Sequence, residues 1–506
     1  MKYQNPIIPG FYPDPSICRV GKDFYLVTST FQYFPGGPIF HSTDLVNWTQ
    51  IGHCLSRESQ LSLNKDMESP GIFAPTIRYN NGVFYMVTTN LENGGNFFVY
   101  TKDPAGEWSD PVWLDQGGID PSLFFDDDGK VYLLSTTEFG VVVPGIRQSE
   151  IDIKTGKRLS DVRFIYSGSG GKHPEGPHMY KYNNMYYLMI AEGGTEHGHM
   201  VTISRSKNPW GPFEVYRNNP ILSHRNRGFS EIAGTGHADI IQDENGDWWM
   251  VFLAFRVSSG YYHHLGRETF LTPFIWNEEG WPVVNGNGTV ELITESDKIK
   301  SEQILMKSEK DDFNQEKLGY QWNFIRNPIK GMYTLEERKG YLRLYGLETS
   351  LSDMGVPAFV GRRQQHYECT ATTLLDFYPK QENEEAGLTV LIDSKHHYEI
   401  AVTSDGIKRR VIVRRTIGML SAIVAEEEIE DGEVNLSIKA VKYKYSFSYA
   451  LGEGEAKEIA AGETRYLSSE VAGGFTGVYI GMYATGNGKG STAYADFDWF
   501  KYDAQQ

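Results

Sequence analysis

A short aromatic segment recurs five times in the first half of the chain, and this repeat limits the fold more than any other feature. Each copy follows a turn rich in Asn, Asp or Gly, as in tight β-hairpins. Successive copies lie 47 to 62 residues apart, which suits one four-stranded sheet with its loops. We therefore predict a five-bladed β-propeller. The copies span residues 24–27, 84–87, 131–134, 186–189 and 248–251.

A second motif precedes each aromatic segment, and it begins with a polar residue in four of the five copies. This leading residue lies 11 or 12 positions before the central aromatic residue of its copy, so we interpret the four as equivalent places in successive blades. The first strand of each blade lines the propeller axis. We expect the four side chains to converge there: Asp14, Asp120, Glu175 and His237.

The repeat stops near residue 295, where a charged stretch over 295–302 is typical of a linker. Short segments with strand-like patterns resume at 341 and continue to 499, without a helical period. We expect an all-β protein, with the propeller over residues 1–300 and a β-sandwich of jelly-roll, concanavalin-like type over residues 310–506.

The charge and composition exclude several classes of function. The net charge of −17 disfavours nucleic acid and anionic membranes as partners. Aromatic residues make up 13% of the chain, which fits strand propensity and also sugar binding. Three cysteines in no metal-ligand spacing predict no disulfide framework. The first residues lack an apolar signal core, so a cytoplasmic location is expected; a homo-oligomer is left open.

Three carboxyl groups on one axis suit the cleavage of glycosidic bonds, which needs one acid and one base or nucleophile. A neighbouring carboxylate raises the pKa of the acid and keeps it protonated. Asp-Pro pairs are also common turns, so Asp14 and Asp120 taken singly have a structural interpretation. His237 has two interpretations, a buried histidine that ties strands together or a ligand of water or metal. No His-Glu-x-x-His or Gly-x-Ser-x-Gly motif is present.

The chain resembles glycoside hydrolase family 43 in residues 5–16, 118–124, 175–178, 234–238, 265–269 and 495–500. The resemblance implies an inverting hydrolase that needs no cofactor, with Asp14 as general base, Glu175 as general acid and Asp120 as the residue that tunes Glu175. It implies that Arg267 binds sugar hydroxyls and that Phe31, Phe73 and Ala74 shape the pocket. It also implies a sandwich loop over 473–477, with Phe475, beside the pocket, and Ca²⁺ in the axial channel near His237.

The expected substrate is a small oligosaccharide, from which the enzyme removes terminal xylose, arabinofuranose or both. We favour β-xylosidase activity, with α-L-arabinofuranosidase as the side or main activity. Two alternatives stay open at this point. A non-catalytic sugar-binding propeller would need the aromatic residues and Arg267 but not all three acids. An invertase-like fructosidase would share the architecture, but the chain lacks the opening motif of that class.

Overall fold

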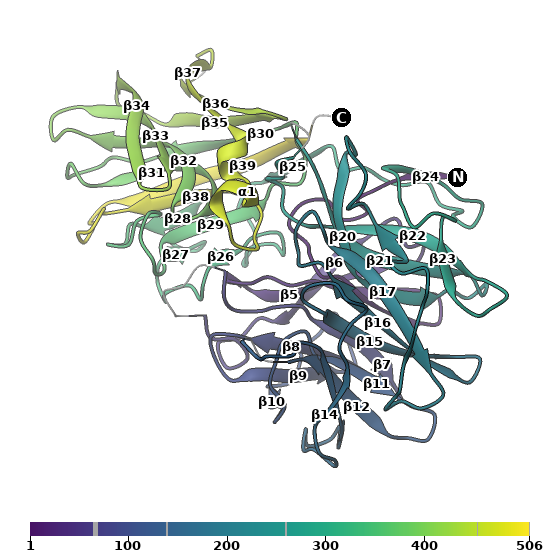
Figure 1. Ribbon diagram of the computed structural model, residues 1–506. Coiled ribbons are helices and arrows are strands. Elements are labelled where there is room, and N and C mark those ends of the chain that lie inside the picture. Colours follow the sequence, from purple (N-terminus) through teal and green to yellow (C-terminus); the bar gives the residue numbers. More distant parts are fainter. Residues whose placement is uncertain (64–68, 138–139, 259–260, 453, 505–506) are drawn as a thin grey trace.

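The computed structural model describes residues 1–63, 69–137, 140–258, 261–452 and 454–504. The fold is all-β; within these ranges the named helices are η1 (Thr464–Leu467) and α1 (Ser469–Ala472). Figure 1 shows two lobes, one built from the purple-to-teal half of the chain and the other from the green-to-yellow half. None of the described helices is long and apolar enough to cross a membrane.

The first lobe contains five antiparallel sheets, each built from one stretch of the chain, so every aromatic repeat forms a sheet with its own neighbours; β4, within the first stretch, pairs elsewhere. The repeats supply the second strand of each sheet. In chain order the sheets are β2 (Ser16–Val20), β3 (Asp23–Val27), β5 (Gly36–Ser42), β6 (Thr49–Leu55); β7 (Thr76–Asn80), β8 (Val83–Asn90), β9 (Gly95–Thr101), β10 (Val112–Trp113); β11 (Ser122–Phe125), β12 (Val131–Thr136), β13 (Ile146–Ile151), β14 (Arg163–Tyr166); β15 (Glu175–Tyr182), β16 (Met185–Glu192), β17 (Met200–Ser206), β18 (Glu214–Val215), with β19 (Leu222–Ser223) beside β17; and β20 (Ile232–Gln242), β21 (Trp248–Arg256), β22 (Glu268–Trp276), β23 (Pro282–Val284).

The first strands of the five sheets form a closed ring of neighbours. Strand β2 contacts β7, β7 contacts β11, β11 contacts β15, β15 contacts β20, and β20 returns to β2. Pairing of β1 (Lys2–Gln4) with β24 (Ile293–Glu295) ties the start of the chain to the end of this lobe. The motif that precedes each aromatic repeat therefore lies at the inner ring.

The strand register corrects one sequence-based expectation. In four of the five aromatic repeats, the last residue pairs with a residue two positions after Asp14, Asp120, Gly176 or His237. These four residues share a left-handed backbone, with φ of 55°, 53°, 57° and 45°. Glu175 lies one residue earlier, so the prediction that it occupies the equivalent place is wrong by one position. Residue spacing alone does not reveal this offset, because the pairing of β15 with β16 shifts register between Glu175 and His178.

The second lobe is a β-sandwich whose two sheets share one apolar core, to which Val411 and Val413 contribute from one sheet and Leu436 and Ile438 from the other. One sheet has the order β27 (Tyr333–Thr334), β28 (Leu342–Tyr345), β39 (Tyr494–Ala504), β30 (Cys369–Asp376), β35 (Val434–Val441), β36 (Lys444–Leu451), β37 (Lys457–Glu463), with β25 (Ser308–Asp311) beside β39. The other has the order β29 (Ala358–Arg363), β38 (Tyr479–Thr485), β31 (Glu385–Asp393), β32 (His396–Ser404), β33 (Arg409–Ile417), β34 (Leu420–Ile429).

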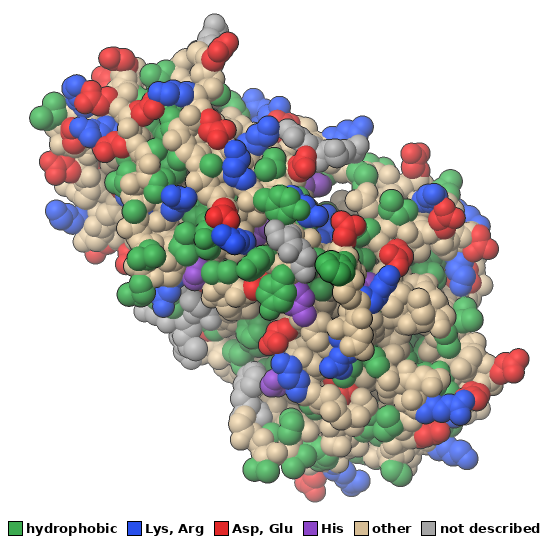
Figure 2. Space-filling view, turned by 45° about the horizontal axis from the view of Figure 1, so that its top comes forward, with side chains coloured by type: hydrophobic (Ala, Val, Ile, Leu, Met, Phe, Trp, Pro, Cys, Tyr) green, Lys and Arg blue, Asp and Glu red, His purple; other side chains and the backbone are tan. Residues whose placement is uncertain are grey.

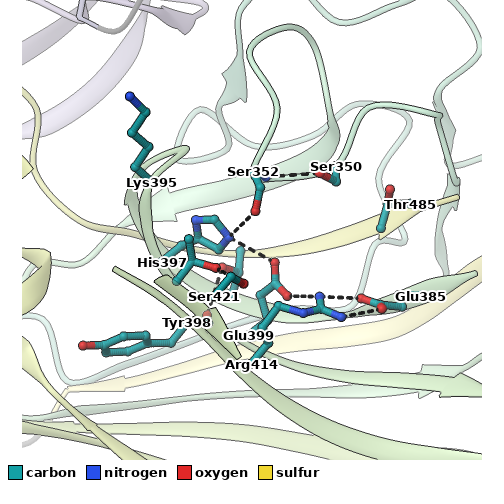
Figure 3. A network of polar contacts seen from close by, with 12 residues as sticks. Ser350, Ser352, Glu385, Lys395, His397, Tyr398, Glu399, Arg414, Ser421 and Thr485 are labelled. Atoms are coloured by element: carbon teal, nitrogen blue, oxygen red, sulfur yellow. Dashed lines mark hydrogen bonds and ion pairs between the residues drawn. The ribbon is translucent and has the colours of Figure 1, made fainter. Parts of the chain in front are cut away.

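Charged residues lie on the face of the six-stranded sheet opposite this core. Figure 3 shows Arg414 between Glu385 and Glu399, with N–O distances of 2.6 Å to each carboxylate. Glu399 also lies 3.3 Å from the imidazole of His397. Both carboxylates are buried. The arginine therefore neutralises charges that would otherwise be costly to bury.

Apolar packing and strand pairing join the two lobes beside the ring. The pair β4 (Tyr33–Phe34) and β26 (Phe324–Ile325) connects the segment after β3 to the start of the second lobe. Tyr33 stacks on Tyr479 with ring centroids 3.8 Å apart, and Phe11 packs edge-on against Tyr479. The loops around the ring are thus fixed in part by the sandwich.

Candidate active site

A pocket of about 230 Å³ lies at the inner ring, and its wall contains every residue predicted for the site from the sequence. Asp14 and Asp120 lie two residues before β2 and β11, and Glu175 is the first residue of β15. Arg267 directly precedes β22. The second lobe contributes one lining residue, Phe475. The wall consists of Asp14, Phe31, Phe73, Ala74, Ile119, Asp120, His173, Glu175, Gly194, Thr195, Glu196, His237, Arg267 and Phe475.

Asp14 is held as a carboxylate in the wall of the pocket. Arg267 Nη1 donates to its Oδ1 at 2.9 Å, the Ser29 hydroxyl donates to its Oδ2, and His237 Nδ1 lies 3.9 Å from Oδ1. Burial raises the pKa of Asp14, but Arg267, His237 and Ser29 outweigh burial and leave the pKa below its ordinary value. This carboxylate is suited to accept a proton.

The pKa values of Glu175 and Asp120 are shifted in the opposite direction, upward. Burial and the neighbouring charges of Asp120 and Asp14 hold the pKa of Glu175 well above its ordinary value. Burial raises the pKa of Asp120 to about 6 against the opposing effect of His237, and the Gly176 N–H donates to Asp120 Oδ2 at 3.1 Å. Glu175 is therefore suited to donate a proton, and Asp120 contributes to that property through its charge.

Arg267 connects the acids to the wall of the pocket. Besides Asp14, Nη1 donates to the Thr195 hydroxyl at 2.9 Å and Nη2 donates to the Phe475 carbonyl at 3.2 Å. The Phe475 N–H in turn donates to Ser69 Oγ at 3.1 Å. The loop over 473–477, expected from the sequence to lie beside the pocket, is thus bound to the first lobe on both sides of Phe475.

Aromatic rings form one side of the pocket. Phe31 lies against Phe73, with centroids 4.9 Å apart, and is stacked on Phe475 at 5.6 Å. Ala74 follows Phe73 in the wall. The Arg267 guanidinium lies 5.4 Å from the Phe31 centroid and 5.9 Å from the Phe475 centroid. Such an apolar face beside polar groups suits a sugar, which carries C–H groups on one face and hydroxyls around its edge.

The surroundings of His237 fit a calcium ion poorly. Ca²⁺ takes six to eight oxygen ligands, whereas the ring of His237 lies near the imidazole of His178, at 6.5 Å between centroids. Asp14 is bound to Arg267 and Ser29, as described above. His178 Nε2 and both ring nitrogens of His199 are buried without a protein partner. The described residues thus place imidazole nitrogens beside the carboxylates of Asp14 and Asp120, which are fewer oxygen ligands than Ca²⁺ takes. The calcium site implied by the resemblance stays a prediction.

The loop between β16 and β17 also lines the pocket, although no residue of it is predicted from the sequence. Thr195 and Glu196 line the pocket, and Thr195 positions Arg267. The signal was the pair Gly193-Gly194, whose φ angles of 95° and 73° allow the chain to turn sharply after a strand. Gly193 also approaches Gly198 so closely that a β-carbon would lie 2.1 Å from its carbonyl oxygen.

Carboxyl groups with opposed pKa shifts, an arginine and an aromatic wall in one small pocket define the active site of a glycoside hydrolase. Residues 3–282 match Glycosyl hydrolases family 43, and residues 310–503 match the Beta xylosidase C-terminal Concanavalin A-like domain. The chain belongs to glycosyl hydrolases family 43. The expected enzyme class and the concanavalin-like type of the second domain are confirmed.

The relatives cover the whole length of the chain. It is 45% identical to a non-reducing end alpha-L-arabinofuranosidase of Bacteroides ovatus, over 99% of this chain and 94% of the relative. It is 40% identical to a xylosidase/arabinosidase of Butyrivibrio fibrisolvens, over 98% of each. Among solved structures, the Bacteroides ovatus protein described as Xyloglucan PUL GH43B matches with a TM-score of 0.96 over 100% of both chains, at 45% identity.

Proposed function

We propose that this protein is an inverting, exo-acting glycoside hydrolase that releases terminal xylose, arabinofuranose or both from short oligosaccharides. The observation that carries the proposal is the pairing of two opposed carboxyl groups, Asp14 and Glu175, in one small pocket. Its volume of about 230 Å³ lies below the ~300–1,000 Å³ of drug-sized sites, which favours a single sugar unit over a long chain.

In the proposed reaction, Glu175 donates its proton to the glycosidic oxygen as the bond to the leaving group breaks. Asp14 accepts a proton from a water molecule, which attacks the anomeric carbon from the opposite face. Asp120 keeps Glu175 protonated through its charge. Arg267 holds Asp14 ionised and presents its guanidinium to sugar hydroxyls. One displacement by water inverts the anomeric configuration.

The names of relatives support both pentoses. The 45% identical Bacteroides ovatus protein is named an arabinofuranosidase, whereas a 34% identical Bacillus subtilis protein, matched over 99% of each chain, is named a beta-xylosidase. The two sugars present similar hydroxyls, and one hydroxyl contact can set the preference. α-L-Arabinofuranosidase is therefore the second candidate, and the 45% identity is the observation that favours it.

The test is a comparison of kcat/KM on aryl β-xyloside, aryl α-L-arabinofuranoside and xylobiose. We expect turnover of all three, with xylobiose cleaved efficiently. Xylobiose turnover far below that of the arabinofuranoside would make α-L-arabinofuranosidase the main activity. Efficient cutting inside long xylan would contradict the exo assignment.

We also propose the finer architecture expected from the sequence. The five sheets in chain order and the closed ring of their first strands support a five-bladed propeller over residues 1–300. The two sheets after residue 307 support a jelly-roll sandwich over 310–506. The cytoplasmic location and a homo-oligomer stay predictions.

A further inference from the structure

A second hollow, of about 450 Å³, adjoins the active-site pocket where the two lobes meet. Thr195, Glu196, Arg267 and Phe475 line both spaces. On the face drawn in Figure 2, hydrophobic and histidine side chains lie in the middle of the view beside charged side chains of both signs. Three residues of the second hollow, His197, His263 and Glu470, have no part in the proposed reaction.

We propose that His197, His263 and Glu470 bind a divalent transition-metal ion, and that Zn²⁺ is the ion they fit best. His197 lies between β16 and β17, His263 lies between β21 and β22, and Glu470 is in α1, which Figure 1 draws on the side of the second lobe that faces the first. One ligand atom from each residue lies within 4.8 Å of the other two. The ion would therefore bridge the two lobes.

The distances suit a small ion after a modest adjustment. His197 Nε2 lies 3.0 Å and His263 Nδ1 lies 2.6 Å from the same atom, Glu470 Oε1. Ligands of a tetrahedral zinc ion stand ~3.3 Å apart, because each lies ~2.0–2.1 Å from the metal. Without metal, imidazole N–H groups donate to Oε1. On binding, each ring presents its lone pair, and its proton moves to the other ring nitrogen.

The ligand types select the metal. Two imidazoles and one carboxylate form a donor set that Zn²⁺ accepts, whereas Ca²⁺ and Mg²⁺ require mostly oxygen. Three protein ligands leave a fourth position, which water in the adjoining hollow can occupy. The net charge of −17 also favours the approach of a cation.

The two histidine rings are already held in place by aromatic neighbours. The His197 ring stacks on Tyr261, with centroids 4.5 Å and planes 6° apart. The His263 ring stacks on Phe255 at 3.8 Å and 14°. The backbone N–H of His263 donates to Glu470 Oε2 at 3.0 Å, which fixes the carboxylate. Little side-chain freedom is therefore lost when an ion binds, and this lowers the entropic cost of binding.

The position of the site connects it to the pocket. His197 is two residues from Thr195, His263 is four from Arg267, and Glu470 is five from Phe475. The ion would thus hold together the three segments that supply Thr195, Arg267 and Phe475 to the pocket wall.

The test is calorimetric titration of the metal-free full chain with ZnCl₂, together with unfolding temperatures measured with and without Zn²⁺. The variants are His197→Gln and the matched control His41→Gln. His41 is a suitable control because it also lies beside a carboxylate, that of Asp23, at 2.7 Å. Its side chain is 32% exposed, as is that of His197. We expect one Zn²⁺ to bind to wild type and to His41→Gln, and to raise both unfolding temperatures.

His197→Gln should bind this ion at least tenfold more weakly and lose the rise in unfolding temperature. A Zn²⁺ ion bound elsewhere, such as at the imidazoles near His237, would bind equally to all three proteins. Wild type that binds no Zn²⁺, or a titration that His197→Gln leaves unchanged, would overturn the proposal. Co²⁺ bound to wild type should also show the visible absorption of a tetrahedral ion, and an octahedral spectrum would count against the site.

Discussion

Arg267 donates to Asp14 at 2.9 Å, and the two residues are 253 positions apart in the sequence. Asp14 lies two residues before the first strand of the first sheet of the ring, whereas Arg267 directly precedes a strand of the last sheet. Closure of the ring therefore brings Asp14 beside the cation that contributes most to keeping it ionised. This contact explains how a buried carboxyl group in the pocket wall stays deprotonated.

Replacing Arg267 should move the acid limb of the pH profile. Arg267 is the largest of the neighbouring charges that lower the pKa of Asp14, so in Arg267→Met this pKa rises and the acid limb of kcat/KM moves to higher pH. The maximum of kcat/KM should fall about 10- to 100-fold, as expected for losing a charged hydrogen bond. Arg267→Lys keeps the charge, so its acid limb should stay near that of wild type while its rate falls. An unmoved acid limb in Arg267→Met would exclude this role.

Replacing Asp120 should move the basic limb of the pH profile of kcat/KM. Burial is the main cause of the raised pKa of Glu175, and the Asp120 charge is the next. Asp120→Asn removes that charge, which favours the carboxylate form of Glu175, so Glu175 loses its proton at lower pH and the basic limb of kcat/KM moves down. The control is Asp126→Asn, because Asp126 is paired with Lys181 instead. A basic limb that is unchanged or higher in Asp120→Asn would contradict the tuning role.

The two proposed catalytic residues should differ in their dependence on the leaving group. Glu175→Gln should lower turnover of xylobiose by about 10²–10⁴-fold, because general acid catalysis is lost. The loss should be much smaller on a dinitrophenyl xyloside, whose leaving group needs no proton. Asp14→Asn should be slow on both substrates, because activation of water is needed in each case. Equal losses on both substrates in Glu175→Gln would remove Glu175 from the role of acid.

The charged cluster in Figure 3 should matter for stability and not for activity. Arg414→Met leaves Glu385 and Glu399 buried without their cation and should lower the free energy of unfolding by about 3 kcal/mol. The matched control is Arg410→Met, because Arg410 pairs with the more exposed Asp405 and Glu426, and its loss should be much smaller. Urea unfolding measures both, and kcat/KM should be unchanged. Equal destabilisation would show that burial of the cluster is unimportant.

The sequence predicted those pocket residues that belong to the repeated motif. Asp14 and Asp120 occupy equivalent places because each begins the same motif, and their shared left-handed backbone confirms this. Glu175 was placed one residue out of register, because counting residues cannot detect a shift in strand pairing. Thr195 could not be assigned, since its role depends on a loop that meets Arg267 only after the ring has closed.

The contacts between the lobes were the least predictable part. The sequence indicated a sandwich loop with Phe475 near the pocket only through family resemblance. It gave no indication that Glu470 meets His197 and His263, which lie 273 and 207 residues away. Such contacts depend on how two apolar faces pack together, and a strand pattern defines each face without fixing their mutual orientation.

The stereochemistry of the first product tests the central claim most directly. NMR of the reaction mixture, recorded before mutarotation, identifies the anomer released from an aryl β-xyloside. With Asp14 as base and Glu175 as acid, water attacks directly, the carboxyl groups stand roughly 6.5–9.5 Å apart, and the first sugar is α-xylose. β-Xylose as the first product would mean a covalent intermediate and would contradict the account.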